Sequence, residues 1–336
     1  MSAIRPQPYR AGRLGRHANV VLTYDNTAQT DGIGAQLQRI YGIYSIAKLL
    51  GTSYLHSPLT RVDYQGFAAL EDDAFDPGFH HEFNDLFQIP SDAMPSDELH
   101  EITLADLTLN GFYQLVALAD TCRRDGKGLL ARLTMPYAIA DRFPDCYEVC
   151  KSISPFVARA RDGRVLRVAI HVRRGELLVL DCERMLPNAY YVSVAQAIAG
   201  LLEALDVGYQ LELCTEVPDH DFIIRPDQPG ISGRIGAPVA VTRQMCRLDE
   251  FGALSNLVHC INETTMECIR RLATADILVM SRSSFSYLGG ILNRRGIVLY
   301  HPFWHGAPSS WIEVSVGGQF DLARLRAVLT DDWLGV

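Results

Sequence analysis

Short apolar runs alternate along this chain with segments of helical period, and this alternation limits the possible folds more than any other feature of the sequence. The run NVVLTYDN at 19–26 is rich in β-branched residues and ends in turn formers, which is typical of a buried strand. A glycine turn (DGIG, 31–34), a segment of helical period (35–50) and a second apolar run (TSYLHSP, 52–58) follow. Strand, glycine turn, helix and strand in this order predict an α/β unit with a parallel sheet.

The second half of the chain repeats the alternation, so the sequence predicts an α/β protein of the GT-B-like kind, with two Rossmann-like domains facing across a cleft. Residues 60–110 are acidic and irregular. The break between the halves falls near 150–165. The predicted parts are a flexible tail at 1–17, an N-terminal domain at 18–160 and a C-terminal domain at 161–336. Further strands are predicted at 128–135, 164–172, 208–216, 237–242, 276–281 and 296–302, and helices at 189–205, 264–275, 284–294 and 320–329.

Composition excludes several classes of protein. The formal net charge of -8 offers no basic surface for nucleic acid. The eight cysteines form no CxxC pair, which indicates reduced thiols rather than a disulfide frame or a zinc site. The sequence shows neither an apolar stretch long enough to span a membrane nor a signal peptide, so we expect a cytoplasmic protein. Four arginines in the predicted tail would allow at most peripheral contact with the inner membrane.

Three polar segments end predicted strands of the second half. They are AIHVRRGEL at 169–177, CTE at 214–216 and SRSSFS at 281–286. In open α/β sheets, ligands bind beyond the carboxyl ends of the strands. The serine segment also begins a helix, whose cap and backbone N–H groups suit an anion. Two adjacent arginines on a strand point to opposite faces, so an anion is needed to meet one of them. The segments therefore predict a phosphate site, most plausibly for a diphosphate.

Three segments of the chain resemble motifs of the fucosyltransferase superfamily, which includes α1,2-, α1,6- and protein O-fucosyltransferases. HVRRGE resembles the HxRRGD segment, SRSSFSYLGGIL is similar to the SxSSFS segment, and DGIGAQLQRIYG resembles the GGLGNQ-type loop. Asp31, Ala35 and Glu176 depart from the usual residues. The resemblance implies inverting, metal-independent transfer of a sugar, most often L-fucose from GDP-fucose, to a glycan. An acidic chain without a signal peptide suits bacterial polysaccharide or lipopolysaccharide assembly, with a lipid-linked or soluble oligosaccharide as the acceptor. The resemblance implies no cofactor besides the GDP-sugar donor.

The resemblance also implies roles for individual residues. Arg173 would meet the diphosphate and stabilise the leaving group. The C-terminal domain would hold the donor and the N-terminal domain would lie on the acceptor side. The donor-binding residues that the resemblance implies are Gly32, Gly34, Gln36, His171, Arg174, Ser283, Ser284 and Phe285. The strand-end segments add Thr215, Glu216 and Ser286 as donor-binding candidates.

An inverting transfer also needs a base for the acceptor hydroxyl. Asp181, which follows the arginine motif, and Asp31, which opens the glycine loop, are equal candidates, and Glu176 is better suited to brace the arginines. Trp304 and His305, in the loop after the last predicted strand, can stack on an acceptor sugar or close the core. These alternatives remain open at the level of sequence.

Two other functions compete with a GDP-sugar transferase. Asp219 and Asp221 form a DxD triplet, which would serve a metal-dependent sugar-nucleotide or phosphate-ester enzyme. A non-catalytic nucleotide-binding protein would use the same phosphate site without turning over a donor. We expect no metal site, because a single DxD is common by chance in an acidic chain.

Overall fold

The computed structural model describes residues 18–27, 31–72, 74–107, 109–134, 144–158, 165–228, 231 and 234–331. The predicted tail and its four arginines lie outside these residues. The chain divides into two compact units. The first consists of Met1–Gln29, Arg39–Pro58 and Gln88–Cys150, and the second of Thr30–Gln38, Leu59–Phe87 and Lys151–Val336.

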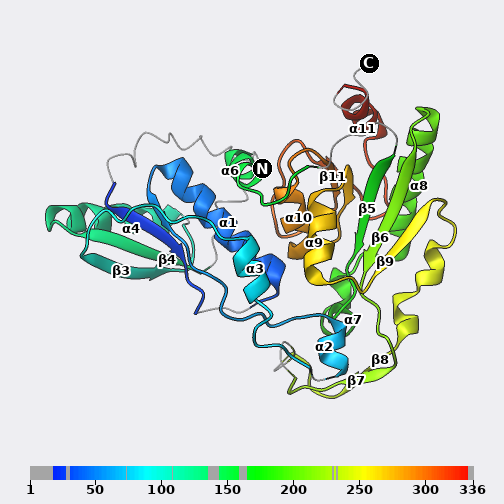
Figure 1. Cartoon of the computed structure of the whole chain (residues 1–336), viewed down its shortest axis with the longest axis horizontal. Coiled ribbons are helices and arrows are strands. Elements are labelled where there is room, and N and C mark those ends of the chain that lie inside the picture. The colour runs from blue at the N-terminus through cyan, green and yellow to red at the C-terminus, as the bar shows by residue number, and fades with distance from the viewer. Residues whose placement is uncertain are drawn as a thin grey trace, which may run out of the picture. The chain divides into compact units, whose positions relative to one another are not determined.

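The first unit contains a four-stranded parallel sheet with the strand order β2-β1-β4-β3 (Figure 1). The central strands β1 (Val20–Tyr24) and β4 (Gly128–Leu133) are buried along nearly their whole length. Such continuous apolar strands are expected where a parallel sheet is covered on both faces. The remaining elements are β2 (Ser53–Leu55), β3 (Leu99–Leu104), α4 (Leu109–Arg124), α6 (Pro144–Ser152) and the larger part of α1 (Ile33–Leu50).

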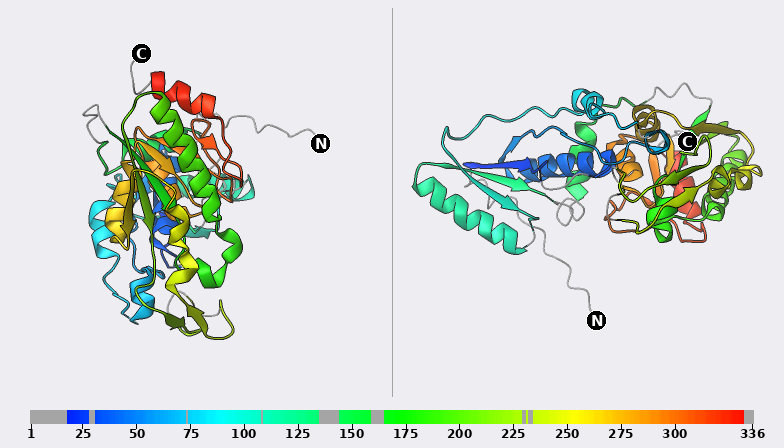
Figure 2. Two further views of the ribbon diagram at one scale, coloured as in Figure 1. Left: turned by 90° about the vertical axis from the view of Figure 1, so that its right-hand side faces the viewer. Right: turned by 90° about the horizontal axis from the view of Figure 1, so that it is seen from below.

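The second unit is built on a six-stranded parallel sheet with the order β12-β11-β10-β5-β6-β9. Its core places the inward residues of the central strands against α8, and α11 packs on α8 from outside the sheet. Helices α9 and α10 pack against each other on the opposite face (Figures 1 and 2). The elements are β5 (Leu166–Val172), β6 (Tyr209–Thr215), β9 (Leu257–Ile261), β10 (Ile277–Val279), β11 (Ile297–Tyr300), β12 (Ile312–Glu313), α8 (Asn188–Ala204), α9 (Thr265–Ala273), α10 (Ser284–Leu292) and α11 (Leu322–Leu329).

A smaller apolar cluster packs the segment 59–87 against the rest of the second unit. Phe67 and Leu70 of α2 (Phe67–Glu71) pack against Ile224 and Val241. The latter two belong to an antiparallel pair formed by β7 (Phe222–Ile224) and β8 (Val239–Val241). Five short helices complete the described part of the second unit: α3 (His81–Leu86), α7 (Leu177–Leu180), η2 (Cys182–Arg184), η3 (Arg243–Cys246) and η4 (Leu248–Phe251).

The prediction of an α/β protein with parallel sheets is confirmed. Each predicted strand and helix has a counterpart, although the strand predicted at 237–242 belongs to the antiparallel pair. The sequence prediction missed β3 and β9, which are edge strands of the two sheets. The two compact units differ from the predicted domains, 18–160 and 161–336, in three segments, 30–38, 59–87 and 151–160, which belong to the second unit. The segment 59–87 does so through the apolar contacts of α2 with β7 and β8. Within the described residues, no helix is both long enough and apolar enough to cross a membrane.

Candidate functional site

The two arginines after β5 have different surroundings. Arg174 is 5% exposed, and its guanidinium donates to the carbonyl of Arg173 at 2.8 Å and to the side-chain oxygen of Asn188 at the start of α8. Gly175 has a φ of +52°, and a Cβ there would lie 2.4 Å from the hydroxyl of Tyr64. The turn therefore needs glycine. Arg174 therefore fixes the turn to α8. The guanidinium of Arg173 is the other cationic group at the end of β5.

Arg173 lies among two carboxylates and an aromatic ring. Its guanidinium forms an ion pair with Glu176, lies 3.8 Å from Glu216 at the end of β6, and stacks 4.7 Å from the ring centroid of Tyr64. The Tyr64 hydroxyl donates to Glu216. Burial lowers the pKa of Arg173, but the neighbouring acids outweigh it and raise the pKa overall, so the charge is permanent. Burial raises the pKa of Glu216, which therefore takes up a proton more readily than an exposed glutamate.

His171 connects the arginine segment to the serine segment. Its Nδ1 lies 2.8 Å from the hydroxyl of Ser281, which is 3.2 Å from the hydroxyl of Ser286. Burial, together with the charges of Arg173 and Arg174, lowers the pKa of His171 to about 3. The imidazole is therefore neutral near pH 7, and His171 holds the two strand ends together without adding charge.

The serine segment begins α10 as the sequence predicts. The hydroxyl of Ser283 accepts the backbone N–H of Phe285 at 3.2 Å, and Ser286 donates to the carbonyls of Ser281 and Ser283. The first turn contains no acidic residue. A helix N-terminus with this composition presents N–H groups and a partial positive charge of about half an elementary charge.

The glycine loop meets this helix end within the second unit. A Cβ on Gly34, in the first turn of α1, would lie 2.4 Å from Cα and 2.6 Å from N of Phe285. Two helix N-termini therefore approach each other at backbone distance, and neither first turn carries an acid. Gln36 braces the loop, because its side-chain amide donates to the carbonyls of Asp31 at 2.8 Å and Arg61 at 2.7 Å.

Gly34→Ala should lower the free energy of unfolding by about 1–3 kcal/mol, since the new methyl group meets backbone atoms that cannot rotate away. Without the contact, alanine in a helix would instead be stabilising by up to about 1 kcal/mol. Gly32→Ala is the matched control, because no atom lies within 4 Å of a Cβ at that position. Urea unfolding of both variants measures the difference, and equal stability would disprove the close approach.

His305 joins three segments of the second unit. Its Nε2 lies 3.0 Å from the Ser284 hydroxyl and accepts the indole N–H of Trp304 at 3.0 Å, while its Nδ1 lies 3.1 Å from the Gln38 amide. The atom of Gln38 that faces Nδ1 is the amide nitrogen. An indole N–H can only donate, so the imidazole proton is on Nδ1, and turning the Gln38 amide by 180° gives that proton an oxygen acceptor. Otherwise that oxygen is buried without a partner. The Ser284 hydroxyl can then donate to His305 or turn towards a ligand.

The candidate acids lie in different surroundings. Glu176 is engaged with Arg173, as a brace would be. Asp181 follows α7 and lies 3.6 Å from Nε of Arg184. Asp31 contributes its backbone carbonyl to Gln36 and to the N–H of Asp63. Thr215, at the end of β6, donates to the carbonyl of Val172 at 2.7 Å.

The DxD triplet lies outside this group of contacts. The Asp219 side chain accepts from Asn262 at 3.2 Å, and its backbone N–H donates to Glu71. Among the residues that the structure describes, no three or more histidine, cysteine or acidic side chains gather as metal ligands.

Sequence reasoning missed several residues that the fold brings to this region. Tyr64 reaches Glu216 from 152 positions away, and Arg184 stacks on Trp304. Arg282, inside the serine segment, donates to the carbonyl of Glu183. No local pattern marks Tyr64 or Arg184. Arg282, however, is visible in the sequence as a basic residue inside the serine segment.

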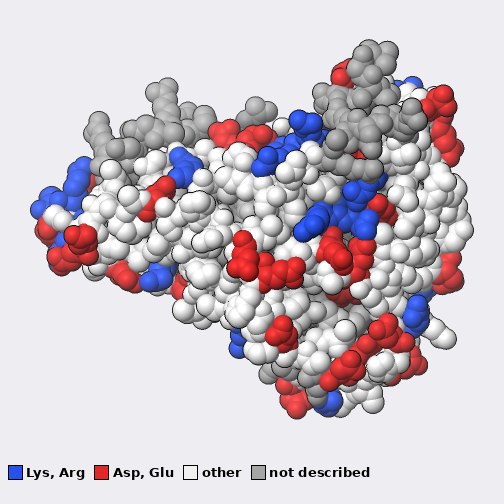
Figure 3. Space-filling view, in the orientation of Figure 1, with Lys and Arg blue, Asp and Glu red and all other residues white. Residues whose placement is uncertain are grey.

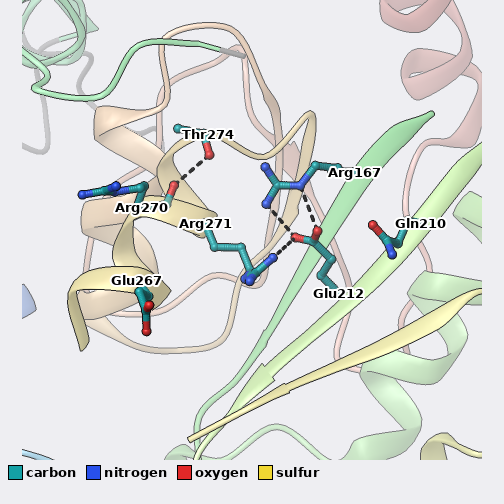
Figure 4. Close-up of a pocket in the computed structure, with 7 residues that line it drawn as sticks. All are labelled: Arg167, Gln210, Glu212, Glu267, Arg270, Arg271 and Thr274. Atoms are coloured by element: carbon teal, nitrogen blue, oxygen red, sulfur yellow. Dashed lines mark hydrogen bonds and ion pairs between the residues drawn. The ribbon is translucent and has the colours of Figure 1, made fainter. Parts of the chain in front are cut away.

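A polar pocket of about 410 Å³ lies between α9 and the sheet of the second unit (Figure 4). Glu212, which is 3% exposed, accepts two hydrogen bonds of 2.8 Å from Arg167 and lies 3.0 Å from Arg271. In the space-filling view, basic and acidic side chains lie next to each other on the surface over α9 (Figure 3). Arg167 is the second residue of β5, so this pocket lies near the amino ends of the strands and is separate from the strand-end site.

Comparison with known proteins identifies no family. No protein-family model matches the chain, and no curated protein matches it. Among solved structures, it is similar to the E. coli heptosyltransferase WaaC with ADP, at 11% identity over 94% of this chain and 99% of that chain with a TM-score of 0.39. It is also similar to the E. coli ADP-heptose lps heptosyltransferase II, at 10% identity over 93% and 99% with a TM-score of 0.38.

A third similar structure is the iron-containing dodecameric glycosyltransferase TibC from enterotoxigenic E. coli, at 9% identity and a TM-score of 0.34. This chain covers 59% of TibC, and 84% of this chain is matched. Structural similarity at this level supports no conclusion about the function of the chain.

Proposed function

We propose that the chain is a glycosyltransferase that takes a sugar from a nucleoside-diphosphate donor, with GDP-fucose as the first candidate, and transfers it with inversion to a glycan. The observation that supports the proposal most is the meeting of three segments that are distant in sequence. Gly34 lies against Phe285, and His171 bonds Ser281, so the glycine loop, the serine segment and the arginine segment belong to one site.

The diphosphate is proposed to bind at the paired N-termini of α1 and α10. Each end contributes a partial positive charge, and both first turns lack acids. Ser284 adds a hydroxyl that can turn from His305 to a phosphate oxygen. Neutral His171 avoids a competing charge and keeps the two segments in register.

Arg173 is proposed to stabilise the leaving group. As the glycosidic bond breaks, negative charge develops on the departing nucleotide, and a fixed guanidinium meets it. In the unliganded protein, Glu176 and Glu216 hold this guanidinium in place. Positive charge supplied by Arg173 and the helix ends is the basis for proposing that no metal is required.

Asp181 is the proposed base, with Asp31 as an equal alternative, and both are ahead of Glu176. Glu176 is committed to Arg173, whereas the ion pair of Asp181 with Arg184 is longer. Thr215 and Glu216 are proposed to position the donor, and Arg174 to hold the turn. The acceptor is proposed to be a glycan or lipid-linked oligosaccharide of bacterial polysaccharide or lipopolysaccharide assembly, with the protein in the cytoplasm.

Calorimetry with GDP, ADP and UDP, followed by release of GDP from GDP-fucose, tests the proposal. We expect GDP to bind at least about tenfold more tightly than UDP, which is a difference of about 1.4 kcal/mol. ADP is included because one solved structure described above contains it. Donor turnover should persist in excess EDTA. Tighter binding of UDP or ADP would disprove the GDP assignment, and activity lost in EDTA and restored by manganese would favour a metal enzyme using Asp219 and Asp221.

A further inference from the structure

Trp304 offers a flat apolar surface in the second unit. Its side chain is 49% exposed, although tryptophan is usually among the more buried residues. The indole N–H is fixed on His305, and the Phe303 ring lies 4.9 Å away. The guanidinium of Arg184 lies 4.3 Å from the Trp304 ring centroid. A half-exposed indole held at both its N–H and its face by neighbouring groups suits stacking with a sugar ring.

Arg184 has donors that the protein does not use. Among the described residues, its guanidinium makes no hydrogen bond, and its one ion pair, to Asp181, measures 3.6 Å. Its Nε, the atom of this ion pair, is buried without a hydrogen-bond partner. Burial lowers the pKa of Arg184, so the surroundings do not fully compensate its charge. Buried donors of a charged group without an acceptor are costly, which is a reason to expect an acceptor from a ligand.

Arg282 repeats this feature beside Arg184. Its Nη1 donates to the carbonyl of Glu183, the residue before Arg184, at 3.3 Å. Its Nε is also buried without a hydrogen-bond partner. Arg282 therefore reaches the residue that precedes Arg184, the arginine that lies over the Trp304 ring, and both guanidinium groups have a buried Nε without a hydrogen-bond partner. Guanidinium groups bind carboxylate and phosphate oxygens with paired hydrogen bonds.

We propose that Trp304, Arg184 and Arg282 form a subsite for a sugar that carries an acidic group. The sugar ring would stack on the indole, and its carboxylate or phosphate would accept hydrogen bonds from the two arginines. If the function proposed above holds, this is the acceptor subsite, because Asp181, the proposed base, contacts Arg184. The acceptor would then be an acidic or phosphorylated glycan.

Binding of simple sugars tests the subsite independently of the donor. Quenching of tryptophan fluorescence and saturation-transfer NMR are measured with methyl β-D-glucuronide, glucose 6-phosphate and neutral methyl β-D-glucoside. We expect at least one acidic sugar to bind about tenfold more tightly than the neutral glycoside, a difference of about 1.4 kcal/mol, since hydrogen bonds between two charged groups are stronger than those between neutral ones. The comparison of the two acidic sugars shows whether the subsite prefers a carboxylate or a phosphate.

Variants test whether Arg184 causes the preference for acidic over neutral sugars. Arg184→Gln should remove most of the preference, and Arg184→Lys should retain part of it. Arg270→Gln, which alters an exposed arginine on α9, should retain all of it. Equal binding of charged and neutral sugars by the wild type, no detectable binding of either acidic sugar, or a full preference in Arg184→Gln would each overturn the subsite. GDP affinity is measured in parallel, so failure of the donor proposal is seen separately from failure of the subsite.

Discussion

Arg173→Ala should lower kcat for donor turnover by about 100-fold or more, as when an enzyme loses a positioned group that stabilises transition-state charge. The substitution also leaves Glu176 and Glu216 without their shared cation. Two carboxylates would then face the departing diphosphate, so the loss should exceed that of a simple missing contact. Release of GDP from GDP-fucose under saturating donor measures the effect, and GDP affinity measured by calorimetry separates catalysis from binding.

Arg173→Lys distinguishes charge from geometry. An ammonium keeps the charge but cannot make two parallel hydrogen bonds or stack on Tyr64 in the same way. We therefore expect the lysine variant to recover less than about a tenth of the lost rate. Arg270→Ala is the control, because it removes an exposed arginine near the separate pocket on α9. Near-wild-type turnover in Arg173→Lys would contradict a two-pronged contact.

The parts of the fold that the sequence predicts are those where burial leaves a local signal. Strands β1 and β5 lie inside parallel sheets, and their apolar, β-branched runs are visible without any knowledge of their partners. β3 and β9 are edge strands with exposed residues along their length, so their sequences resemble loops. The pairing of α2 with β7 and β8 depends on distant contacts and leaves no local pattern.

The same distinction applies to the candidate site. The serine cap of α10 and the strand-end arginines are local features, and the structure places them where the sequence predicts. The different positions of Arg173 and Arg174 could not be read from adjacent letters, because they depend on Asn188 and Glu216. Which residues bind a donor, and which acid is the base, remain predictions.

The largest effect on stability should come from Glu212, a carboxylate inside the second sheet. Arg167 binds both of its oxygens, and Arg271 adds a third contact (Figure 4). Burial would raise the pKa of Glu212, but these bonds and charges outweigh it and lower the pKa below its ordinary value of 4.5. The network is therefore stabilising only while Glu212 is ionised.

Glu212→Gln should lower the free energy of unfolding by about 3–5 kcal/mol, the usual effect of removing one partner from a buried ion pair. The amide keeps the shape but leaves Arg167 without a counter-ion, whereas Arg271 retains Glu263. Urea unfolding followed by tryptophan fluorescence measures the change, since Trp304 and Trp311 belong to the second unit. Asp227→Asn is the control, because Asp227 is 84% exposed and its pair with Arg225 should contribute at most about 1 kcal/mol.

The pH dependence of this loss tests its electrostatic cause. A glutamate whose pKa is lowered by folding binds fewer protons in the native state than in the unfolded state. Its contribution is therefore complete above pH 4.5, the ordinary pKa, and disappears as the pH falls through the lower pKa of the folded protein. The difference in stability between wild type and Glu212→Gln should shrink over this acidic range. A difference that stays constant down to the acid transition would mean that Glu212 acts through packing and not through its charge.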